Sequence, residues 1–393
     1  MGIVIVDLLC VSPFYDKYLC EAMQQKGTRV RLSSISFHLE KDYFRNAGVR
    51  RSSWVMDVVA RSSLTNVFLR RMLKTCEYAI NILLQSVYFY CTQPHIVHIQ
   101  WLPFLRFIQL ELFWLRFLKQ CGFKVVFTAH NILPHDSGKQ CIPRFKKLYH
   151  LVDHLVVHTD LAKRELVSQY DIDKAKISVI PHGPLFHDVE CGTKQCCRSK
   201  VSLPKDQEVV LFIGTCKPYK GIEFLVRSFG LVLQECPNAV LVIAGNGDPD
   251  YLSAIRALAQ KCLPSQSVSL VLRGLSNDEL VMYHVASDLV VFPYRDITQS
   301  GALLTAMAFG KAIVATNLGG FQETLEHDVT ALLVPYNDFP ALAAAIVKVL
   351  KNPAIKDKIG EGAAQQVRRK YGWDIITEKT LSCYRQLLQD VGV

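Results

Sequence analysis

The sequence predicts an α/β protein with two parallel, doubly wound sheets, one in each half of the chain. Three observations lead to this prediction. Short runs rich in Val and Ile alternate with longer helical segments along the whole chain. The length of 393 residues exceeds one ordinary core and suits two domains. Half of the residues are hydrophobic and only 20% are charged, which excludes a disordered chain.

In the first half, six short runs have the composition of buried strands, and helical segments separate them. The expected strands are 2–6, 28–34, 95–100, 124–130, 154–159 and 176–183. The expected helices are 14–26, 65–90, 102–121 and 159–170. No G-x-G-x-x-G motif follows the first strand, so this half has no dinucleotide fingerprint.

In the second half, the same alternation starts again after a polar stretch rich in Cys and Lys. The expected strands are 208–214, 239–247, 268–274, 289–294 and 312–316. The expected helices are 221–235, 249–262, 276–286, 300–310 and two later ones, followed by an amphipathic helix at 373–388. We therefore expect a Rossmann-like domain at 1–185, a linker at 186–204, a second Rossmann-like domain at 205–372 and a closing helix at 373–393.

The net charge of +10 is confined to the first half. Residues 1–185 contain 24 Lys and Arg against 14 Asp and Glu, whereas the remaining residues contain 21 of each. Such a one-sided field favours an anionic acceptor or a membrane surface, with plain solubility as the alternative. The basic residues are dispersed and form no nucleic-acid module, so no nucleic-acid partner is expected.

No window reaches the roughly 18 uncharged apolar residues that a membrane span requires. The nearest is 101–118, which Arg106, Glu111 and Arg116 interrupt. We expect a helix here, with its apolar face in the core or against a membrane surface. The N-terminus has no basic leader and is expected to be a first strand instead of a signal peptide.

Thirteen cysteines are scattered over the expected strands and helices, so free thiols in a reducing cytoplasm are expected. Cys191, Cys196 and Cys197 have no second ligand pair at zinc spacing, and we expect them in a loop. No H-E-x-x-H or comparable spacing occurs, so no metal centre is expected.

The stretch FIGTCKPYKG is the first candidate for a phosphate site. Gly214 would let the backbone approach a ligand, and Gly221 begins a helix. Lys217 and Lys220 add two positive charges at the same place, which matches the charge of a diphosphate. The alternative is a pair of surface lysines on a loop.

The stretch YRDITQSGALLTAMAFG is the second candidate. Ser300 is an expected N-cap, and Gly301, Ala302 and Leu303 form the first helical turn, whose amides could face a phosphate. The alternative is a capped core helix, because the following residues are apolar. Both stretches follow strands of one parallel sheet, so they are expected at the same edge, where they would share a diphosphate.

Other strand ends provide weaker candidates. Gly245 and Asn246 lie in a tight loop after strand 239–247, where glycine could serve the turn alone. Arg273 could line a base or ribose site, or form a salt bridge at the strand end. His130 ends a strand of the first domain and precedes a loop with Pro134, His135 and Asp136; its alternative role is a structural hydrogen bond. The remaining histidines of this half are expected at packing positions: His95, His98, His150, His154 and His158.

Together these motifs resemble the nucleotide-sugar-dependent glycosyltransferases of family 4, which have the GT-B fold. The matching stretches occur in family order: VIPHG, FIG…KPYKG, VIAGNGD, RG…DELVMYHVASDLVVFPY, SGALLTAMAFGKAIVATNLGG and the helix from Trp373. The resemblance covers nearly the whole chain and is strongest after Val179. It implies two Rossmann-like doubly wound domains facing a central cleft, with the last helix crossing back to the first domain.

The resemblance also implies roles for single residues. Lys220 would grip the donor diphosphate, with Lys217 in place of the usual arginine, and His130 would contact the donor sugar. Gly301 to Leu303 would meet the phosphates.

One feature departs from the family pattern. The family commonly carries two glutamates with seven residues between them, and alignment on AMAFG places these at Ile297 and Thr305. Thr305 can make a single hydrogen bond to a ribose hydroxyl. Gln299 and Ser300 are expected to replace the sugar contact of the first glutamate.

The missing acids need not remove the reaction. In the retaining mechanism that the resemblance implies, the leaving phosphate accepts the proton of the incoming hydroxyl, so no protein carboxylate is required. Catalysis then depends on stabilising charge at the phosphate and on orienting two substrates.

The expected function is transfer of a sugar from a nucleotide-diphosphate sugar to a hydroxyl acceptor, without metal or other cofactor. An acceptor linked to a lipid phosphate, at the inner face of the cell membrane, would place the protein in surface polysaccharide or glycolipid assembly. The main alternative is a non-catalytic nucleotide-sugar-binding or scaffold protein of the same fold. An epimerase would need well-placed acids, and a pyridoxal-dependent phosphorylase would need a longer chain.

Overall fold

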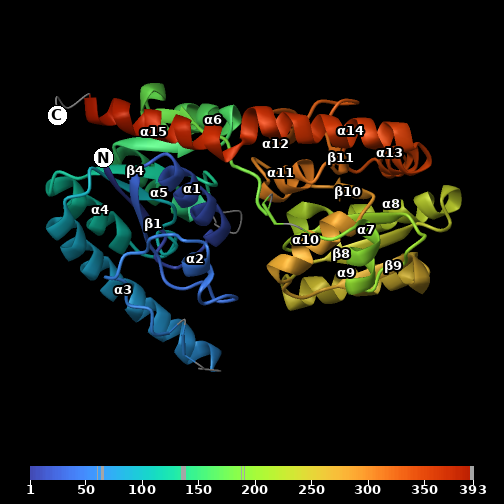
Figure 1. Cartoon of the computed structure of the whole chain (residues 1–393), viewed down its shortest axis with the longest axis horizontal. Helices are drawn as coiled ribbons and strands as arrows, with labels where there is room; N and C mark the ends of the chain where they lie inside the picture. Colours follow the sequence, from blue (N-terminus) through green and yellow to red (C-terminus); the bar gives the residue numbers. More distant parts are fainter. Residues whose placement is uncertain (60, 63–65, 134–138, 187, 190, 390–393) are drawn as a thin grey trace. The chain divides into compact units, whose positions relative to one another are not determined.

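The computed structural model divides into two compact units, each with its own sheet and core (Figure 1). The first unit comprises Met1–His182 and Trp373–Val393, and the second comprises Gly183–Gly372. The residues that the structure describes are 1–59, 61–62, 66–133, 139–186, 188–189 and 191–389.

The first unit is built on a six-stranded parallel sheet with the order β2-β1-β3-β4-β5-β6. Its strands are β1 (Gly2–Val6), β2 (Arg29–Ser33), β3 (Ile96–Ile99), β4 (Lys124–Thr128), β5 (His154–Val157) and β6 (Ile177–Val179). Its helices are α1 (Pro13–Gln25), α2 (Tyr43–Asn46), α3 (Val67–Thr92), α4 (Leu110–Gln120), α5 (Ile142–Leu151), α6 (Asp160–Tyr170) and α15 (Trp373–Gln389), with 3₁₀ turns η1 (Lys139–Cys141) and η2 (Lys174–Lys176).

The last helix of the chain belongs to the first unit, where α15 packs on α1. The Trp373 ring stacks on Tyr18, with ring centres 5.6 Å apart. Further along the helix, the hydroxyl of Tyr384 lies 2.5 Å from Nδ1 of the buried His98. These aromatic contacts use the buried stripe of an amphipathic helix that has no following strand.

The second unit has a six-stranded parallel sheet with the order β12-β11-β10-β7-β8-β9. Its strands are β7 (Val209–Ile213), β8 (Val240–Ala244), β9 (Val268–Val271), β10 (Leu289–Phe292), β11 (Ala312–Thr316) and β12 (Leu332–Val334). Its helices are α7 (Lys194–Lys200), α8 (Ile222–Glu235), α9 (Pro249–Cys262), α10 (Asn277–Ala286), α11 (Gly301–Ala308), α12 (Gly319–Gln322), α13 (Phe339–Lys351) and α14 (Pro353–Gln366), with 3₁₀ turns η3 (Pro218–Lys220) and η4 (Ser265–Ser267) and a π-helical turn η5 (Val367–Tyr371).

The predicted α/β fold with two parallel, doubly wound sheets is confirmed. The central strands β7, β8, β10 and β11 are buried along their whole length, as expected for parallel strands covered on both faces. The three-residue strand β12 was not predicted, because its short apolar run ALLV is not distinguishable by pattern from a core loop.

Two segments differ from the prediction. The stretch 102–109 is not helical, and α4 begins only at Leu110. The chain before α4 folds around the buried carboxylate of Glu111, which accepts hydrogen bonds from Phe104 N and the Tyr78 hydroxyl. The stretch 186–204 is not a simple loop, since it contains α7. Arg198 on α7 forms a buried ion pair with Asp288, with 2.7 Å between Nη2 and Oδ2. This ion pair holds α7 in the second unit.

In the described part of the chain, none of the helices combines the length and the hydrophobicity that a transmembrane span requires. All thirteen cysteines are free. Cys196 and Cys197 lie on α7 and not in the expected loop. Within the described part of the chain, no group of three or more His, Cys, Asp or Glu side chains could hold a metal ion.

Candidate functional site

The carboxyl edge of the second sheet carries most of the predicted donor-binding residues. The strand order changes direction between β7 and β10, and doubly wound sheets bind ligands at such a switch point. Lys220 follows β7 and Ser300 follows β10, so both lie at this point. A backbone hydrogen bond from Arg295 N to Tyr219 O, 2.7 Å long, joins the two loops.

Lys220 is a nearly buried cation. Its side chain is only 9% exposed, and its Nζ lies 5.3 Å from the centre of the Tyr294 ring. Among the described residues, no carboxylate forms an ion pair with it. Burial lowers the pKa of Lys220, and the neighbouring Tyr219 and Cys216 oppose this only in part. A buried charge without a counter-charge destabilises the fold, so the site is suited to an anion.

Ser300 caps α11, as predicted, and its hydroxyl accepts a hydrogen bond from Leu303 N at 3.2 Å. The Leu303 amide, which was predicted to face a phosphate, is therefore occupied by the cap. The amides of Gly301 and Ala302 have no acceptor within the described residues and remain available to an anion. The Tyr294 ring lies beside Lys220, and burial raises the pKa of its hydroxyl, a shift that the neighbouring Ser300 opposes.

Two glycines allow the loops at this edge to pack closely. Gly221 has φ of 63°, and a Cβ there would lie 2.0 Å from Pro293 O in the loop after β10. Gly245 has φ of 151°, and its Cβ would lie 1.9 Å from Gly214 O. Any side chain at either position would push apart the loops that follow β7, β8 and β10.

The two positions at which the resemblance to family 4 implies glutamates are buried. Ile297 is 6% exposed and belongs to the core of the second unit. Thr305 is 3% exposed; its hydroxyl donates to Gly301 O at 2.9 Å and accepts from Leu185 N at 3.2 Å. The hydroxyl of Thr305 thus already has two partners. A ribose contact by Thr305 and a sugar contact by the partly exposed Gln299 stay predictions.

The remaining residues predicted in this unit lie around the same loops or beside them. Asn246 is exposed, and its carbonyl accepts a hydrogen bond from Cys216 N at 2.6 Å. Lys217 is partly exposed and begins the turn η3. Arg273 forms an ion pair with Glu279, with 2.5 Å between Nη2 and Oε1, so the strand-end salt bridge is the arrangement present.

In the first unit, His130 is held at the carboxyl edge of the sheet directly after β4. Its Nε2 lies 2.9 Å from Oε1 of Gln100, and its Nδ1 lies 2.9 Å from Nε2 of His158. The Trp101 ring stacks on the imidazole, with centres 4.9 Å apart and planes 7° apart. His130 and Val11 line a pocket of about 190 Å³. This volume is smaller than that of a typical complete ligand site.

One assignment of protons satisfies this whole chain of contacts. Nδ1 of His158 must donate, because its partner at 2.9 Å is the carbonyl oxygen of Ile180. A neutral His158 then accepts at Nε2 from Nδ1–H of His130, so Nε2 of His130 must be an acceptor. The Gln100 amide therefore has to be turned by 180°, so that its NH₂ takes the place of the Oε1 that faces His130. This orientation of the amide also gives a partner to the Gln100 nitrogen, which is otherwise buried without one.

Both imidazoles are neutral at pH 7. Burial lowers the pKa of His130 well below its usual value of 6.5, and the neighbouring His158 and His182 lower it further. Burial likewise lowers the pKa of His158 to about 3. His130 is therefore an oriented, uncharged hydrogen-bonding group, and the loop 134–138 that follows it lies outside the described residues.

Three residues of these arrangements were not predicted as functional. Tyr294, Gln100 and His158 each stand at the end of an expected strand, which is the signal that could have marked them. His158 was predicted to be a packing residue, and its side chain is buried. Its hydrogen bond to His130, 28 residues earlier, follows only from the parallel pairing of β4 and β5.

Comparison with known families gives two matches that follow the division of the chain. Residues 17–183 match the family described as Glycosyltransferase Family 4, and residues 207–352 match Glycosyl transferases group 1.

Among curated proteins, a D-inositol 3-phosphate glycosyltransferase of Kineococcus radiotolerans is 29% identical over 67% of this chain and 63% of its own length. An uncharacterized glycosyltransferase of Methanocaldococcus jannaschii is also 29% identical, over 58% of this chain and 59% of its own. The chain thus spans just under two thirds of the length of these relatives.

Solved structures show the same fold at low identity. Sucrose-phosphate synthase from Thermosynechococcus elongatus has a TM-score of 0.76 at 20% identity, covering 99% of this chain and 100% of its own. HepE of Anabaena, solved in complex with UDP and glucose, has a TM-score of 0.76 at 14% identity. The match covers 98% of this chain and 100% of HepE. The likeness to these structures shows the GT-B fold, and the two family matches show that the chain belongs to glycosyltransferase family 4.

Proposed function

We propose that this protein transfers a sugar from a nucleotide-diphosphate sugar to a hydroxyl acceptor, with retention of configuration. The observation that carries the proposal is the nearly buried ammonium of Lys220, which has no acidic partner among the described residues. A diphosphate would supply the missing counter-charge. Family membership and the switch point between β7 and β10 support the same placement.

In the proposed donor site, a charged side chain and backbone amide dipoles both bind the phosphate. Lys220 holds one full positive charge near the leaving phosphate, and the amides of Gly301 and Ala302 point free donors at the same group. As the bond between the anomeric carbon and the phosphate oxygen breaks, negative charge grows on that oxygen. Groups fixed before the reaction stabilise this charge without reorganising, and loss of one such donor typically costs about 10²- to 10³-fold in rate.

The proton and the bonds balance without a protein carboxylate. The acceptor oxygen forms a bond to the anomeric carbon on the face that the phosphate leaves, and the acceptor proton passes to the leaving phosphate oxygen. The protein positions both partners and excludes competing water. Ile297 and Thr305 supply no acid, which is consistent with this route and also with a binding protein that has lost catalysis.

In the proposed reaction, His130 orients the donor sugar. Its imidazole is neutral and held by Gln100, His158 and Trp101, so it offers fixed hydrogen-bonding geometry. The acceptor class stays open between an anionic hydroxyl compound and a lipid-phosphate-linked sugar, and the proposed setting is surface polysaccharide or glycolipid assembly. The basic first half supports an anionic acceptor.

The test is a panel of UDP- and GDP-sugars, with release of free nucleotide and calorimetric binding measured in parallel. We expect one donor to be bound and slowly hydrolysed, and Lys220→Ala to abolish both signals. Lys358→Ala, which changes an exposed lysine of the same unit, serves as the control and should behave as wild type.

The two readouts separate the competing functions. Binding that depends on Lys220 without any turnover, with acceptor extracts present, would support the non-catalytic alternative. Absence of binding by every nucleotide sugar and by the free nucleoside diphosphates would contradict the proposed donor site itself.

A further inference from the structure

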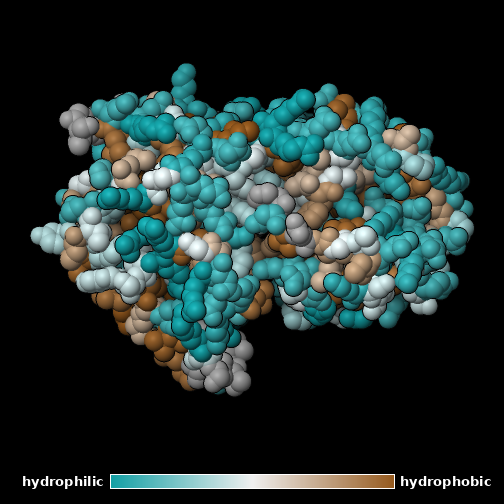
Figure 2. Space-filling model, in the orientation of Figure 1, coloured by the Kyte–Doolittle hydropathy of each residue, from teal (hydrophilic) through white to brown (hydrophobic). Residues whose placement is uncertain are grey.

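The helix α3 of the first unit exposes an apolar stripe along its whole length of roughly 39 Å. Its large exposed apolar side chains recur at intervals of three and four residues from Phe68 to Leu73 and from Ile80 to Tyr90, with a step of seven residues from one run to the next, and Leu83 is 68% exposed. Figure 2 shows hydrophobic surface along this helix. The exposed members of the stripe are Phe68, Leu69, Met72, Leu73, Ile80, Leu83, Val87 and Tyr90.

The core side of α3 is mixed, with buried polar side chains next to the apolar core residues Ile82 and Phe89. Glu77, Asn81 and Gln85 point inward and hold the chain between residues 54 and 59. Glu77 accepts hydrogen bonds from Val58 N and Val59 N. The Asn81 side chain accepts from Met56 N and donates to Met56 O. The apolar stripe lies outside the core, because its members are exposed while another side of the helix, with Ile82, Phe89 and these polar contacts, faces the core.

The neighbouring segment continues this apolar surface. α4 packs against α3 through hydrogen bonds from Tyr78 to Glu111 and from Trp114 to Ser86. On the outer side, Phe113 is 60% exposed. The exposed apolar residues of this segment are Phe107, Ile108, Leu110, Phe113 and Phe117. Contiguous exposed apolar surface of this kind marks an interaction site.

The exposed charge around this surface has a single sign. The helices α3, α4 and α5 contain two acids, Glu77 and Glu111, and both are buried. All their other charged residues are basic: Arg70, Arg71, Lys74, Arg116, Lys119, Arg144, Lys146 and Lys147. We call this combined surface of α3, α4, α5 and residues 104–109 the basic apolar face.

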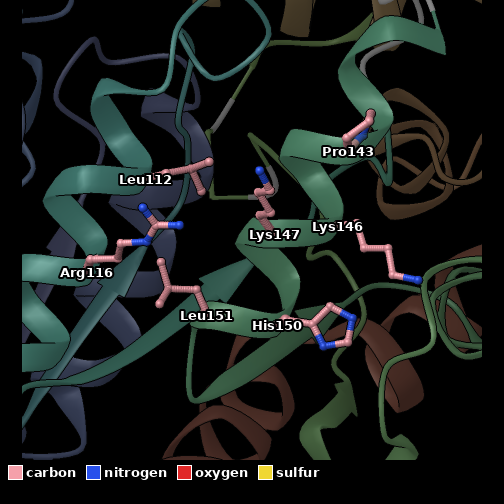
Figure 3. A pocket seen from close by; sticks show the side chains of 7 residues that line it. All are labelled: Leu112, Arg116, Pro143, Lys146, Lys147, His150 and Leu151. Carbon is pink, nitrogen blue, oxygen red and sulfur yellow. The ribbon is translucent and has the colours of Figure 1, made fainter.

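A pocket of about 540 Å³ between α4 and α5 lies within this face, with Leu112 and Leu151 in its lining (Figure 3). Arg116 extends from α4 toward Lys147 on α5. Within the described residues, neither cation forms an ion pair. The Arg116 guanidinium lies 5.8 Å from the centre of the exposed Phe113 ring, so positive charge and apolar surface adjoin each other.

We propose that the basic apolar face binds an anionic lipid bilayer, with the apolar stripe in the interface and a lipid phosphate in the pocket between Arg116 and Lys147. An interfacial helix places its apolar side chains at the boundary of the acyl chains, while basic groups contact the headgroups. A second copy of the chain fits less well, because a symmetric contact would bring two basic surfaces together. A nucleic acid would match the charge but leave the apolar stripe without a partner. The inference does not depend on the proposed sugar transfer.

The test is sedimentation of the full chain with vesicles of phosphatidylcholine, with and without phosphatidylglycerol, at low and high salt. We expect binding only to the anionic vesicles, reduced by high salt but not abolished. Arg116→Glu/Lys147→Glu should weaken binding about 30-fold or more at low salt, because each basic residue near the membrane contributes about 1 kcal/mol. The matched control is Arg369→Glu/Lys370→Glu, which makes the same change of charge at exposed positions of the second unit and should bind as wild type.

The apolar contribution is tested by Leu83→Ser/Phe113→Ser, which leaves the charge unchanged and should remove the binding that persists at high salt. Leu231→Ser/Val329→Ser, at exposed apolar positions of the second unit, is its control. Circular dichroism verifies the fold of every variant, and the lipid and salt dependence of the wild type tests the proposal without any variant.

Three results would overturn the proposal. The first is equal sedimentation with and without anionic vesicles. The second is a stable dimer in sedimentation velocity that Leu83→Ser/Phe113→Ser dissociates, because a second copy would then cover the face. The third is salt-dependent binding of RNA that the apolar pair leaves intact while vesicle binding is absent.

Discussion

The ammonium of Lys220 lies against the aromatic face of Tyr294, 5.3 Å from the ring centre, with no carboxylate of the described residues paired to it. Lys220 follows β7 and Tyr294 follows β10, so this contact bridges the point at which the strand order changes direction. A cation over an aromatic ring retains only part of the stabilisation that water or a carboxylate would give it. The arrangement therefore leaves a favourable place for an anion.

The first prediction concerns the cost of this cation to stability. Lys220→Met should raise the unfolding free energy by about 1 kcal/mol, because it removes a nearly buried charge and keeps the side-chain volume. The same variant should lose affinity for nucleoside diphosphates. Urea denaturation and calorimetry measure the two effects, with Lys358→Met as control. A variant that is both less stable and unchanged in binding would show that Lys220 is a structural residue.

The second prediction concerns the close packing of the site loops. Gly221 and Gly122 both have positive φ, but only at Gly221 would a Cβ collide with backbone, 2.0 Å from Pro293 O. Gly122→Ala should cost about 1 kcal/mol of unfolding free energy, from backbone strain alone. Gly221→Ala should cost about 3 kcal/mol or more and weaken donor binding, because the loops after β7 and β10 must separate. Equal costs measured by denaturation would contradict the packing described for this edge.

The third prediction concerns the pH dependence of stability. Burial raises the pKa of Glu111 from 4.5 to about 7, and one of its carboxylate oxygens has no partner among the described residues. Between these values the folded protein holds a proton that the unfolded chain has released. The contribution of Glu111 to the unfolding free energy therefore falls as the pH rises from about 4.5 to about 7, by about 3 kcal/mol.

The matched measurement compares wild type with Glu111→Gln, which keeps an acceptor for the Tyr78 hydroxyl. The difference between their unfolding free energies should change across this pH interval in favour of the variant. A difference that is constant between pH 4 and 8 would show that Glu111 titrates normally.

The fourth prediction concerns the hydrogen bond between His130 and His158, through which His158 is expected to orient His130. His158 is proposed to act only by accepting the Nδ1–H of His130. His158→Ala should therefore lower the rate of donor turnover about 10- to 100-fold through misorientation of His130. In a His130→Ala background the same change should have almost no further effect, because the coupled pair acts as one unit. Additive losses in this double-mutant cycle would assign His158 an independent role.

The sequence was sufficient to predict the architecture for a physical reason. Buried parallel strands are continuous apolar runs, and the intervening helices have clear periodicity, so eleven of the twelve strands that the structure describes could be located from pattern alone. It failed for β12, whose run is too short, and for α7, whose stability depends on an ion pair between Arg198 and the distant Asp288. Contacts between residues 90 positions apart leave no local pattern.

The same distinction applies to the site. Lys220 and Ser300 could be predicted because each stands at a junction whose local chemistry binds anions. The use of the Leu303 amide by the Ser300 cap could not be judged from sequence, since it depends on the rotamer of one hydroxyl. Tyr294, Gln100 and His158 acquire their roles only when neighbouring strands align their ends.

The central claim is that Lys220 and the start of α11 bind one diphosphate. A crystal structure of the protein with UDP or GDP, chosen by the binding screen, tests it most directly. We predict the distal phosphate within about 3 Å of Lys220 Nζ and of the amides of Gly301 and Ala302. A nucleotide bound with its phosphates away from these groups, while Lys220 remains against Tyr294 without an anion, would contradict the account.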